Sequence, residues 1–198
     1  MNDFHTPIQD RPLWFVMRDL KRCNAKQPAY KLFKDLGMEV FTPMVWKLSV
    51  KHGKRCREEV PFIQDLLFVN GTRLAVDPIV EKYNTVQYRY LRGGYKIPMT
   101  VRESDMERFI HAVESSENPC YYTPEEISSD MIGRKVRIVG GPLDGYEGNL
   151  QKIQGAHIKR LFVELPSLLA AAVEVQPEYI QRSQIPRRGI ESSAKLLS

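Results

Sequence analysis

No run of apolar residues in this chain of 198 is long enough to span a bilayer. The opening residues, MNDFHTPIQDRPLW, lack the basic and apolar segments of a signal peptide. Three widely spaced cysteines, Cys23, Cys56 and Cys120, form no CxxC pair, which argues against a disulfide framework and a zinc ribbon. We therefore expect a protein of the reducing cytoplasm that makes no contact with a membrane.

The residue constellations of common enzyme sites are also missing. No serine or cysteine stands in a nucleophile elbow, and the acid pairs Glu58-Glu59 and Glu125-Glu126 are typical of solvated surface. The histidines are scattered and suit no metal geometry; they are His5, His52, His111 and His157. We predict that the protein is not an enzyme and needs no cofactor or metal.

The stretch KVRIVGGPLDGYEGNL, residues 135–150, is rich in glycine but is not a phosphate-binding loop. Such a loop needs Gly-Lys-Ser/Thr at the start of a helix. Here the glycines lead into Asn149 and a second alternation of polar and apolar residues. The pattern predicts a strand, a turn and a strand.

Charge is distributed unevenly along the chain. Lys and Arg outnumber Asp and Glu by 19 to 13 in residues 1–113 and by 10 to 6 in residues 132–198, whereas residues 114–131 carry five acids and no base. Two basic bodies joined by an acidic connector favour an anionic partner such as nucleic acid.

The first half of the chain has the pattern of an α+β domain. LWFVMR (13–18) predicts a strand, and NAKQPAYKLFKDLG (24–37) predicts a helix with Asn24 as its cap. Asp77-Pro78 predicts the start of a second helix, TVQYRYL another strand, and Thr100 with Glu103 a capping box before a third helix. The order β-α-β-β-α-β-α predicts a largely antiparallel sheet flanked by helices.

Between the first two helices, MEVFTPMVWKLSV and EEVPFIQDLLFVNG bracket the basic sequence KHGKR. Two strand-like runs of this kind predict a long hairpin with Gly53 at its tip. Five Lys/Arg fall within eleven residues there, namely Lys47, Lys51, Lys54, Arg55 and Arg57. They either bind phosphates or keep a solvated tip soluble. Trp46 beside them is either a strand-end core residue or a platform for stacking.

After residue 113 the pattern changes twice. ESSENPCYYTPEEISSD (114–130) has prolines and acids but little periodicity, which predicts a linker with nothing to bury. Four strands are then predicted, from KVRIV, EGNLQKIQ, HIKRLFVEL and LLAAAVEVQ. Closure of these strands into a small barrel would leave no unprotected sheet edge. LPSLLAAAVEV also has high helix propensity, but its valines favour a strand.

Taken together, the WFVM strand, the helix-flanked sheet, the acidic linker and GRKVRIVGGPLDGYEGNLQKI resemble the NusG type of transcription elongation factor over residues 13–180. The last stretch is similar to a KOW motif, with Val136, Gly141, Gly145 and Gly148 as its motif residues. Within the family the chain most resembles specialised antiterminators of capsule and exopolysaccharide loci.

The resemblance implies an organisation in two domains. An N-terminal tail covers residues 1–12, an NGN-like polymerase-binding domain 13–114, an acidic flexible linker 115–131, an SH3-like KOW barrel 132–181, and a disordered tail 182–198. It further implies a non-enzymatic, monomeric antitermination factor that suppresses pausing or termination.

The implied partners are the clamp helices of the largest RNA polymerase subunit, upstream or non-template DNA or nascent RNA, and a ribosomal protein or termination factor at the KOW domain. The polymerase-facing candidates are Trp14, Phe15, Phe62, Leu66, Phe68 and Tyr90, and each of them is also a candidate for ordinary core. Leu66 and Phe68, two apart on one strand, share a face. With Tyr90 they are predicted to form an exposed apolar depression, although Leu66 stands where the family has a tyrosine.

KOW barrels also occur in ribosomal proteins, so a ribosome-associated RNA-binding protein is the alternative. A helix-covered α+β domain before the barrel favours the polymerase factor.

Overall fold

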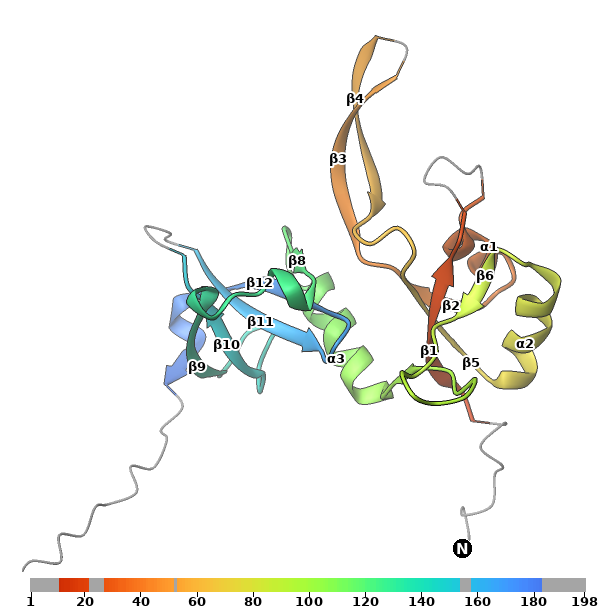
Figure 1. Ribbon diagram of the computed structural model, residues 1–198. Coiled ribbons are helices and arrows are strands. Elements are labelled where there is room, and N and C mark those ends of the chain that lie inside the picture. The colour runs from red at the N-terminus through yellow and green to blue at the C-terminus, as the bar shows by residue number, and fades with distance from the viewer. Residues whose placement is uncertain (1–10, 22–26, 52, 154–157, 183–198) are drawn as a thin grey trace, which may run out of the picture.

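The computed structural model describes residues 11–21, 27–51, 53–153 and 158–182, and it contains two main β-sheets with helix α3 between them (Figure 1). One sheet has five strands in the order β2-β5-β1-β6, with β7 also paired to β1, and the other has six in the order β13-β9-β10-β11-β12-β8. All the pairings described in both sheets are antiparallel. The mixed fold with antiparallel sheets and few helices agrees with the predicted class, while the SH3-like barrel and the domain boundaries stay predictions.

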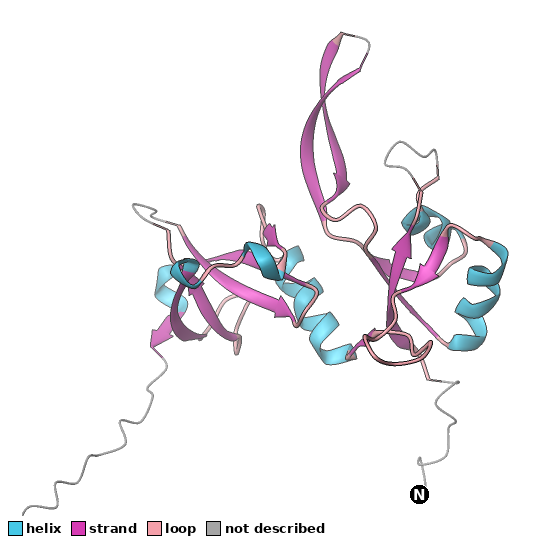
Figure 2. Cartoon of the chain, in the orientation of Figure 1, coloured by secondary structure: helices cyan, strands magenta, loops and turns pink. Residues whose placement is uncertain are grey.

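The five-stranded sheet is built on β1, which alternates its side chains between two apolar layers. Its strands are β1 (Leu13–Asp19), β2 (Glu39–Phe41), β5 (Leu67–Gly71), β6 (Val86–Tyr88) and β7 (Thr100–Val101). Phe15 and Met17 face helices α1 (Ala29–Asp35) and α2 (Arg73–Lys82), whereas Trp14 and Val16 face α3 (Glu103–Glu114). Burial on both faces follows from the period of two in a strand. Figure 2 shows the helices on either side of this sheet.

Helix α1 begins later than the sequence predicts, at Ala29, and the predicted cap Asn24 lies outside the described residues. Asp19, at the end of β1, accepts hydrogen bonds from the backbone N–H of Ala29 (2.6 Å) and of Lys21 (2.9 Å). Asp19 is only 8% exposed, and a buried carboxylate needs such donors. Asp19, ten positions upstream of Ala29, therefore accepts the hydrogen bond at the start of α1 that a local N-cap side chain would otherwise accept.

The predicted starts of α2 and α3 are both wrong. Thr72 caps α2 by accepting from the backbone N–H of Ala75 (3.3 Å), so Pro78 falls inside the helix rather than in its first turn. Helix α3 begins at Glu103, with Arg102 at the cap position and no side-chain cap, while Thr100 belongs to β7. Because Thr100 is part of strand β7, it is not the N-cap that the predicted capping box required.

Residues 115–131, predicted to be a flexible acidic linker with nothing to bury, contain regular elements. They include β8 (Cys120–Tyr122) and the short 3-10 helices η2 (Pro124–Glu126) and η3 (Ser129–Met131). β8 pairs with β12, and Tyr121 is buried with its ring 5.6 Å from that of Phe62. The prediction that this segment buries nothing is therefore wrong. The local pattern did not indicate the burial because the partners of the segment, β12 and Phe62, are distant in the sequence.

The six-stranded sheet confirms the four strands predicted after residue 132. Its other strands are β9 (Ile132–Ile138), β10 (Glu147–Gln151), β11 (Lys159–Leu165), β12 (Leu169–Val175) and β13 (Ile180–Arg182), the last preceded by η4 (Pro177–Tyr179). The leucine-alanine run forms β12 and not a helix, since its residues pair with β11 along their whole length. The predicted C-terminal tail lies, apart from Arg182, outside the described residues, as do ten of the twelve residues of the N-terminal tail.

Helix α3 packs against both sheets. One apolar cluster runs without interruption from Trp14 and Phe68, through Met106 and Phe109 of α3, to the buried side chains of the six-stranded sheet. Tyr146, in the turn before β10, donates from its hydroxyl to the carbonyl oxygen of Arg108 (2.9 Å). The two sheets are therefore joined by packing as well as by the chain.

Polar contacts with α3 surround that tyrosine. The Tyr146 hydroxyl lies 3.0 Å from Nδ1 of His111, and the Arg108 guanidinium lies 4.7 Å from the centre of the ring. Burial raises the pKa of Tyr146, an effect that the nearby Arg108 cation opposes. Tyr146 therefore links the second sheet to two residues of α3, Arg108 and His111, through polar contacts.

Candidate functional site

The hairpin of β3 (Met44–Lys51) and β4 (Lys54–Pro61) projects from the body of the protein (Figures 1 and 2). It forms a two-stranded sheet of its own, paired from Met44 and Pro61 at the base to Lys51 and Lys54 at the tip. Gly53 turns the chain with a φ of +75°, a conformation in which glycine has no steric penalty. The predicted hairpin and its tip are confirmed.

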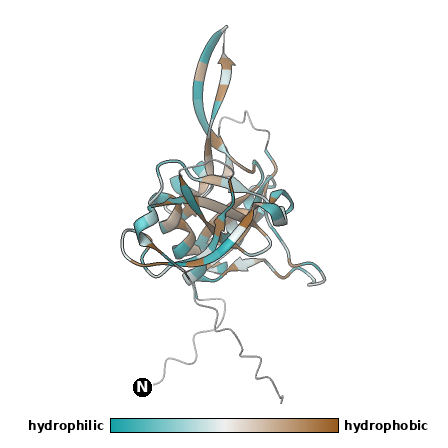
Figure 3. Ribbon diagram, turned by 90° about the vertical axis from the view of Figure 1, so that its left-hand side faces the viewer, coloured by the Kyte–Doolittle hydropathy of each residue, from teal (hydrophilic) through white to brown (hydrophobic). Residues whose placement is uncertain are grey.

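One face of the hairpin carries a stripe of exposed apolar side chains. Trp46, Leu48 and Val50 alternate along β3 and are 60%, 70% and 68% exposed. Directly opposed residues of an antiparallel pair share a face, which places Arg57 and Arg55 across from Leu48 and Val50, and Glu59 across from Trp46. We call these six residues the tryptophan face. Figure 3 shows hydrophobic and hydrophilic stretches along both strands of the hairpin.

The opposite face, which we call the lysine face, is more polar. Lys47 and Lys54 are exposed there, and the Ser49 hydroxyl lies 3.2 Å from the Cys56 sulfur. The side chain of Lys51 lies outside the described residues. The predicted basic cluster therefore splits, with two arginines on one face and lysines on the other.

Trp46 is not a core residue. The Arg57 guanidinium lies 4.8 Å from the centre of its ring, a cation–π contact, and most of the side chain still faces solvent. Of the two alternatives that the sequence leaves open, the strand-end core position is wrong. The stacking platform stays a prediction.

Four of the six residues predicted to face polymerase are buried: Trp14, Phe15, Leu66 and Phe68. Phe15 lies in the layer under α1 and α2, and the other three lie in the layer under α3. The shared face of Leu66 and Phe68 is confirmed, but this face is covered. Their role in binding polymerase stays a prediction.

The remaining two candidates are accessible but lie apart. Tyr90 is 46% exposed, and its ring is 6.4 Å from that of Tyr88, which in turn contacts Phe15. Tyr90 therefore belongs to the sheet face opposite Phe68, so the predicted depression of Leu66, Phe68 and Tyr90 does not form. Phe62 lies at the base of the hairpin and is partly exposed.

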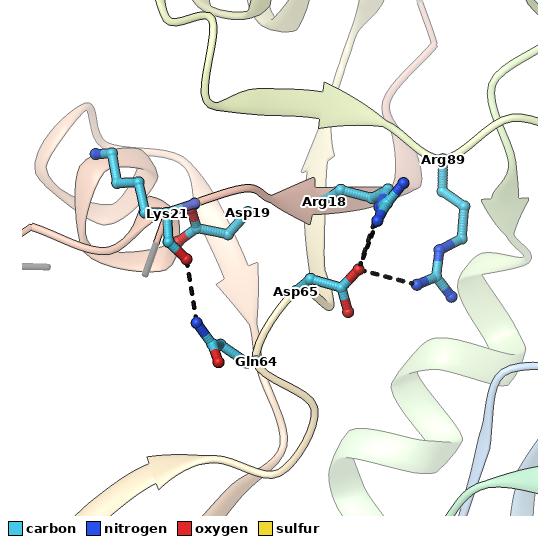
Figure 4. A network of polar contacts seen from close by, with 6 residues as sticks. All are labelled: Arg18, Asp19, Lys21, Gln64, Asp65 and Arg89. Carbon is cyan, nitrogen blue, oxygen red and sulfur yellow. Dashed lines mark hydrogen bonds and ion pairs between the residues drawn. The ribbon is translucent and has the colours of Figure 1, made fainter. Parts of the chain in front are cut away.

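A polar network fixes the turn between the hairpin and β5 (Figure 4). Asp65 accepts from Nε and Nη2 of Arg18 (3.2 and 3.1 Å), and Nη2 of Arg89 lies 3.8 Å from the same carboxylate oxygen. Gln64 donates from its amide to the carbonyl oxygen of Lys21 (3.1 Å). Asp65 thus ties the turn to β1, and Gln64 ties it to Lys21 just after that strand, so that the chain enters β5 with Leu66 directed into the core.

The predicted KOW residues lie on β9, β10 and the turn between them. Val136 is buried and pairs with Gly148. A Cβ on Gly148 would come within 2.6 Å of the Phe162 carbonyl oxygen, and one on Gly141 within 2.7 Å of the Tyr179 ring. Gly145 has a φ of +78° and open space around it. The close approaches at Gly148 and Gly141 show why a larger residue would push neighbouring chain segments apart.

In the part of the chain that the structure describes, no group of three or more His, Cys, Asp and Glu side chains could hold a metal ion. Among the same residues, none of the helices has the length and apolar character needed to cross a membrane.

Comparison with known proteins places a family domain over the first sheet. Residues 13–110 match the family described as NusG: Transcription termination factor nusG. This match runs from the first residue of β1 into α3 and includes the whole hairpin. No curated protein matches the chain.

Proposed function

We propose, because residues 13–110 carry a NusG family domain, that the protein binds transcribing RNA polymerase and suppresses pausing or termination. Domains of this family are typical of transcription elongation and antitermination factors, which act without catalysing a reaction. The resemblance of the chain to specialised antiterminators extends the proposal to operons for capsule and exopolysaccharide biosynthesis. The family match is the observation that carries the proposal.

The base of the hairpin is the surface that we propose for the polymerase clamp helices. Val45, Phe62 and Ile63 are partly exposed there and pack on the apolar cluster beneath α3. Partly exposed apolar residues over a rigid core suit the tip of a helical coiled coil, in the mode of a helix in a groove. The buried Leu66 and Phe68 would then support the surface from below.

Such a factor acts by favouring one state of polymerase. A protein that binds the closed clamp better than the open clamp shifts the equilibrium by the difference between its two affinities. The basic hairpin would add contacts to upstream or non-template DNA or to nascent RNA, whose phosphates need only positive charge. The second sheet would recruit a ribosomal protein or a termination factor, and the protein would work as a cytoplasmic monomer.

The direct test is single-round transcription with purified polymerase and the full chain. We expect the protein to bind elongation complexes and to shorten pauses. Phe62→Ala should weaken binding about tenfold, the effect of losing an interface residue worth more than 1 kcal/mol. Tyr95→Ala is the matched control, because Tyr95 is 88% exposed and lies in a loop distant in sequence from the hairpin.

A sucrose gradient of cell extract decides between the two candidate partners. Co-sedimentation with RNA polymerase supports the proposal. If the protein travels with ribosomal subunits and does not bind purified elongation complexes, the proposal is wrong, and the protein is a ribosome-associated RNA-binding protein.

Hairpin charge is tested by replacing Lys47, Lys54, Arg55 and Arg57 with serine. Binding to an elongation complex should weaken, and the slope of log K against log salt should fall by about one for each phosphate that the variant no longer neutralises. Arg11, Lys31, Lys34 and Lys82 provide a matched control set away from the hairpin. An unchanged slope in the hairpin variant would mean that these charges only keep the hairpin soluble.

A further inference from the structure

The exposure of Trp46 needs an explanation that the sheet does not supply. The other tryptophan, Trp14, is 3% exposed in the core, whereas Trp46 is 60% exposed on a ribbon with no helix or sheet described against its face. Large apolar side chains grouped on the surface of a soluble protein usually mark a binding site. Leu48 and Val50 continue the exposed stripe toward the tip.

Positive charge dominates the part of this stripe toward the tip. Arg55 and Arg57 stand across from Val50 and Leu48, and Lys54 lies at the tip. Glu59 stands across from Trp46 on the same face, and Glu58 lies on the opposite face across from Lys47. A partner that contacts the stripe therefore meets two guanidinium groups beside an aromatic ring, a combination that suits a phosphodiester chain with exposed bases.

Paired and unpaired nucleotides differ in what they offer to Trp46. The faces of bases inside a duplex are covered by their neighbours, so an indole ring finds no surface on which to stack. Unpaired bases expose their faces and stack on aromatic side chains without regard to sequence. We propose that the tryptophan face holds unpaired nucleotides, with a base stacked on Trp46 and the flanking phosphates on Arg55 and Arg57. This inference rests on the proposed nucleic-acid contact of the hairpin and names the form of nucleic acid that it takes.

The test measures binding of the full chain to fluorescein-labelled oligonucleotides of about 12 nucleotides, a length within the range of single-strand binding sites. The probes are oligodeoxythymidylate, oligouridylate and a DNA duplex of the same length. Trp46→Ala should weaken binding to the single strands by about tenfold, the typical effect of losing one stacked base. Duplex binding should change less than about twofold, because the phosphate contacts remain. The DNA and RNA arms identify which strand the face prefers.

Two controls separate stacking from structure. Trp46→Phe keeps an aromatic ring and should retain most of the single-strand affinity. Tyr95→Ala removes another exposed aromatic ring, which also has a lysine beside it, and should leave binding unchanged. Quenching of tryptophan emission by the single strand should disappear in Trp46→Phe, since Trp14 is buried.

Several results would overturn the inference. Wild-type protein that does not bind single strands, or equal losses for single strands and duplex in Trp46→Ala, would exclude a stacked base. If Trp46→Ala binds the oligonucleotides normally but binds purified polymerase more weakly, the tryptophan face docks a protein. Each of these results leaves the proposed function standing as long as the wild-type protein binds elongation complexes.

Discussion

The two tryptophans of this protein occupy strands with opposite surroundings. Trp14 lies on β1, which has neighbours on both sides and a helix over its face, while Trp46 lies on β3, whose only described strand partner is β4. β1 is a continuous apolar run, whereas β3 alternates polar and apolar residues. An alternating strand usually buries its apolar face, so the local pattern does not predict that Trp46 is exposed. The layers around a strand decide whether its side chains stabilise the fold or remain available to a partner.

The largest predicted effect comes from truncating one apolar side chain in each of these two regions. Phe68→Ala should lower the free energy of unfolding by about 3–5 kcal/mol, because Phe68 is fully buried and its removal leaves a cavity. Urea unfolding followed by circular dichroism measures the change. Leu48→Ala on the hairpin is the control and should cost less than about 0.5 kcal/mol, since its side chain is 70% exposed.

The same variant separates core from interface at Phe68. A Phe68→Ala protein that unfolds early but, once folded, binds polymerase normally supports the core assignment. A protein of normal stability that no longer binds would contradict the burial of this side chain.

A second prediction concerns Tyr121, which lies where the hairpin base meets the second sheet. Burial, and then the Glu59 carboxylate, raise its pKa to about 12 from the usual value near 10. Because the neutral form is favoured in the folded state, the stabilisation is complete below pH ~10 and is lost as the pH rises toward ~12. The loss should amount to about 2–3 kcal/mol.

Tyr121→Phe, which keeps the ring but cannot ionise, isolates this effect. Between pH ~9 and ~12 the wild-type protein should lose more stability than the variant in urea unfolding. Parallel losses in the two proteins would show that Tyr121 ionises as freely as an exposed tyrosine.

The smallest predicted effect concerns the contact between α3 and the second sheet. Tyr146→Phe removes the hydroxyl that bonds to the Arg108 carbonyl oxygen and contacts His111. The expected cost is about 1 kcal/mol, the net value of a typical hydrogen bond. Limited proteolysis should then cut residues 115–131 faster than in the wild-type protein. Unchanged cleavage would mean that this contact does not hold the two sheets together.

The fold is predictable from the sequence where its determinants are local. The alternation around Gly53 predicts the hairpin, and the alternation in residues 135–150 predicts the strand, turn and strand of β9 and β10. The run LLAAAVEV has competing propensities, and its valines indicated the correct strand.

The fold is not predictable from local sequence where a distant residue decides the outcome. Asp19 caps a helix ten residues away, and Tyr121 is buried because β8 pairs with β12. The exposure of Trp46 was equally beyond local pattern, since it depends on whether another layer covers the hairpin. For the same reason the sequence shows which candidate site residues are apolar or basic but does not predict which of them are exposed.

The position of β8 at the edge of the six-stranded sheet also has a consequence for synthesis on the ribosome. Tyr121 of β8 pairs with Ala171 of β12, so β8 is synthesised long before its partner strand. Until β12 has been translated, the nascent chain exposes Tyr121 and the surface of α3 that packs on the second sheet. A chain that stalls before Leu169 would carry this uncovered apolar surface and would be prone to aggregate or to recruit chaperones.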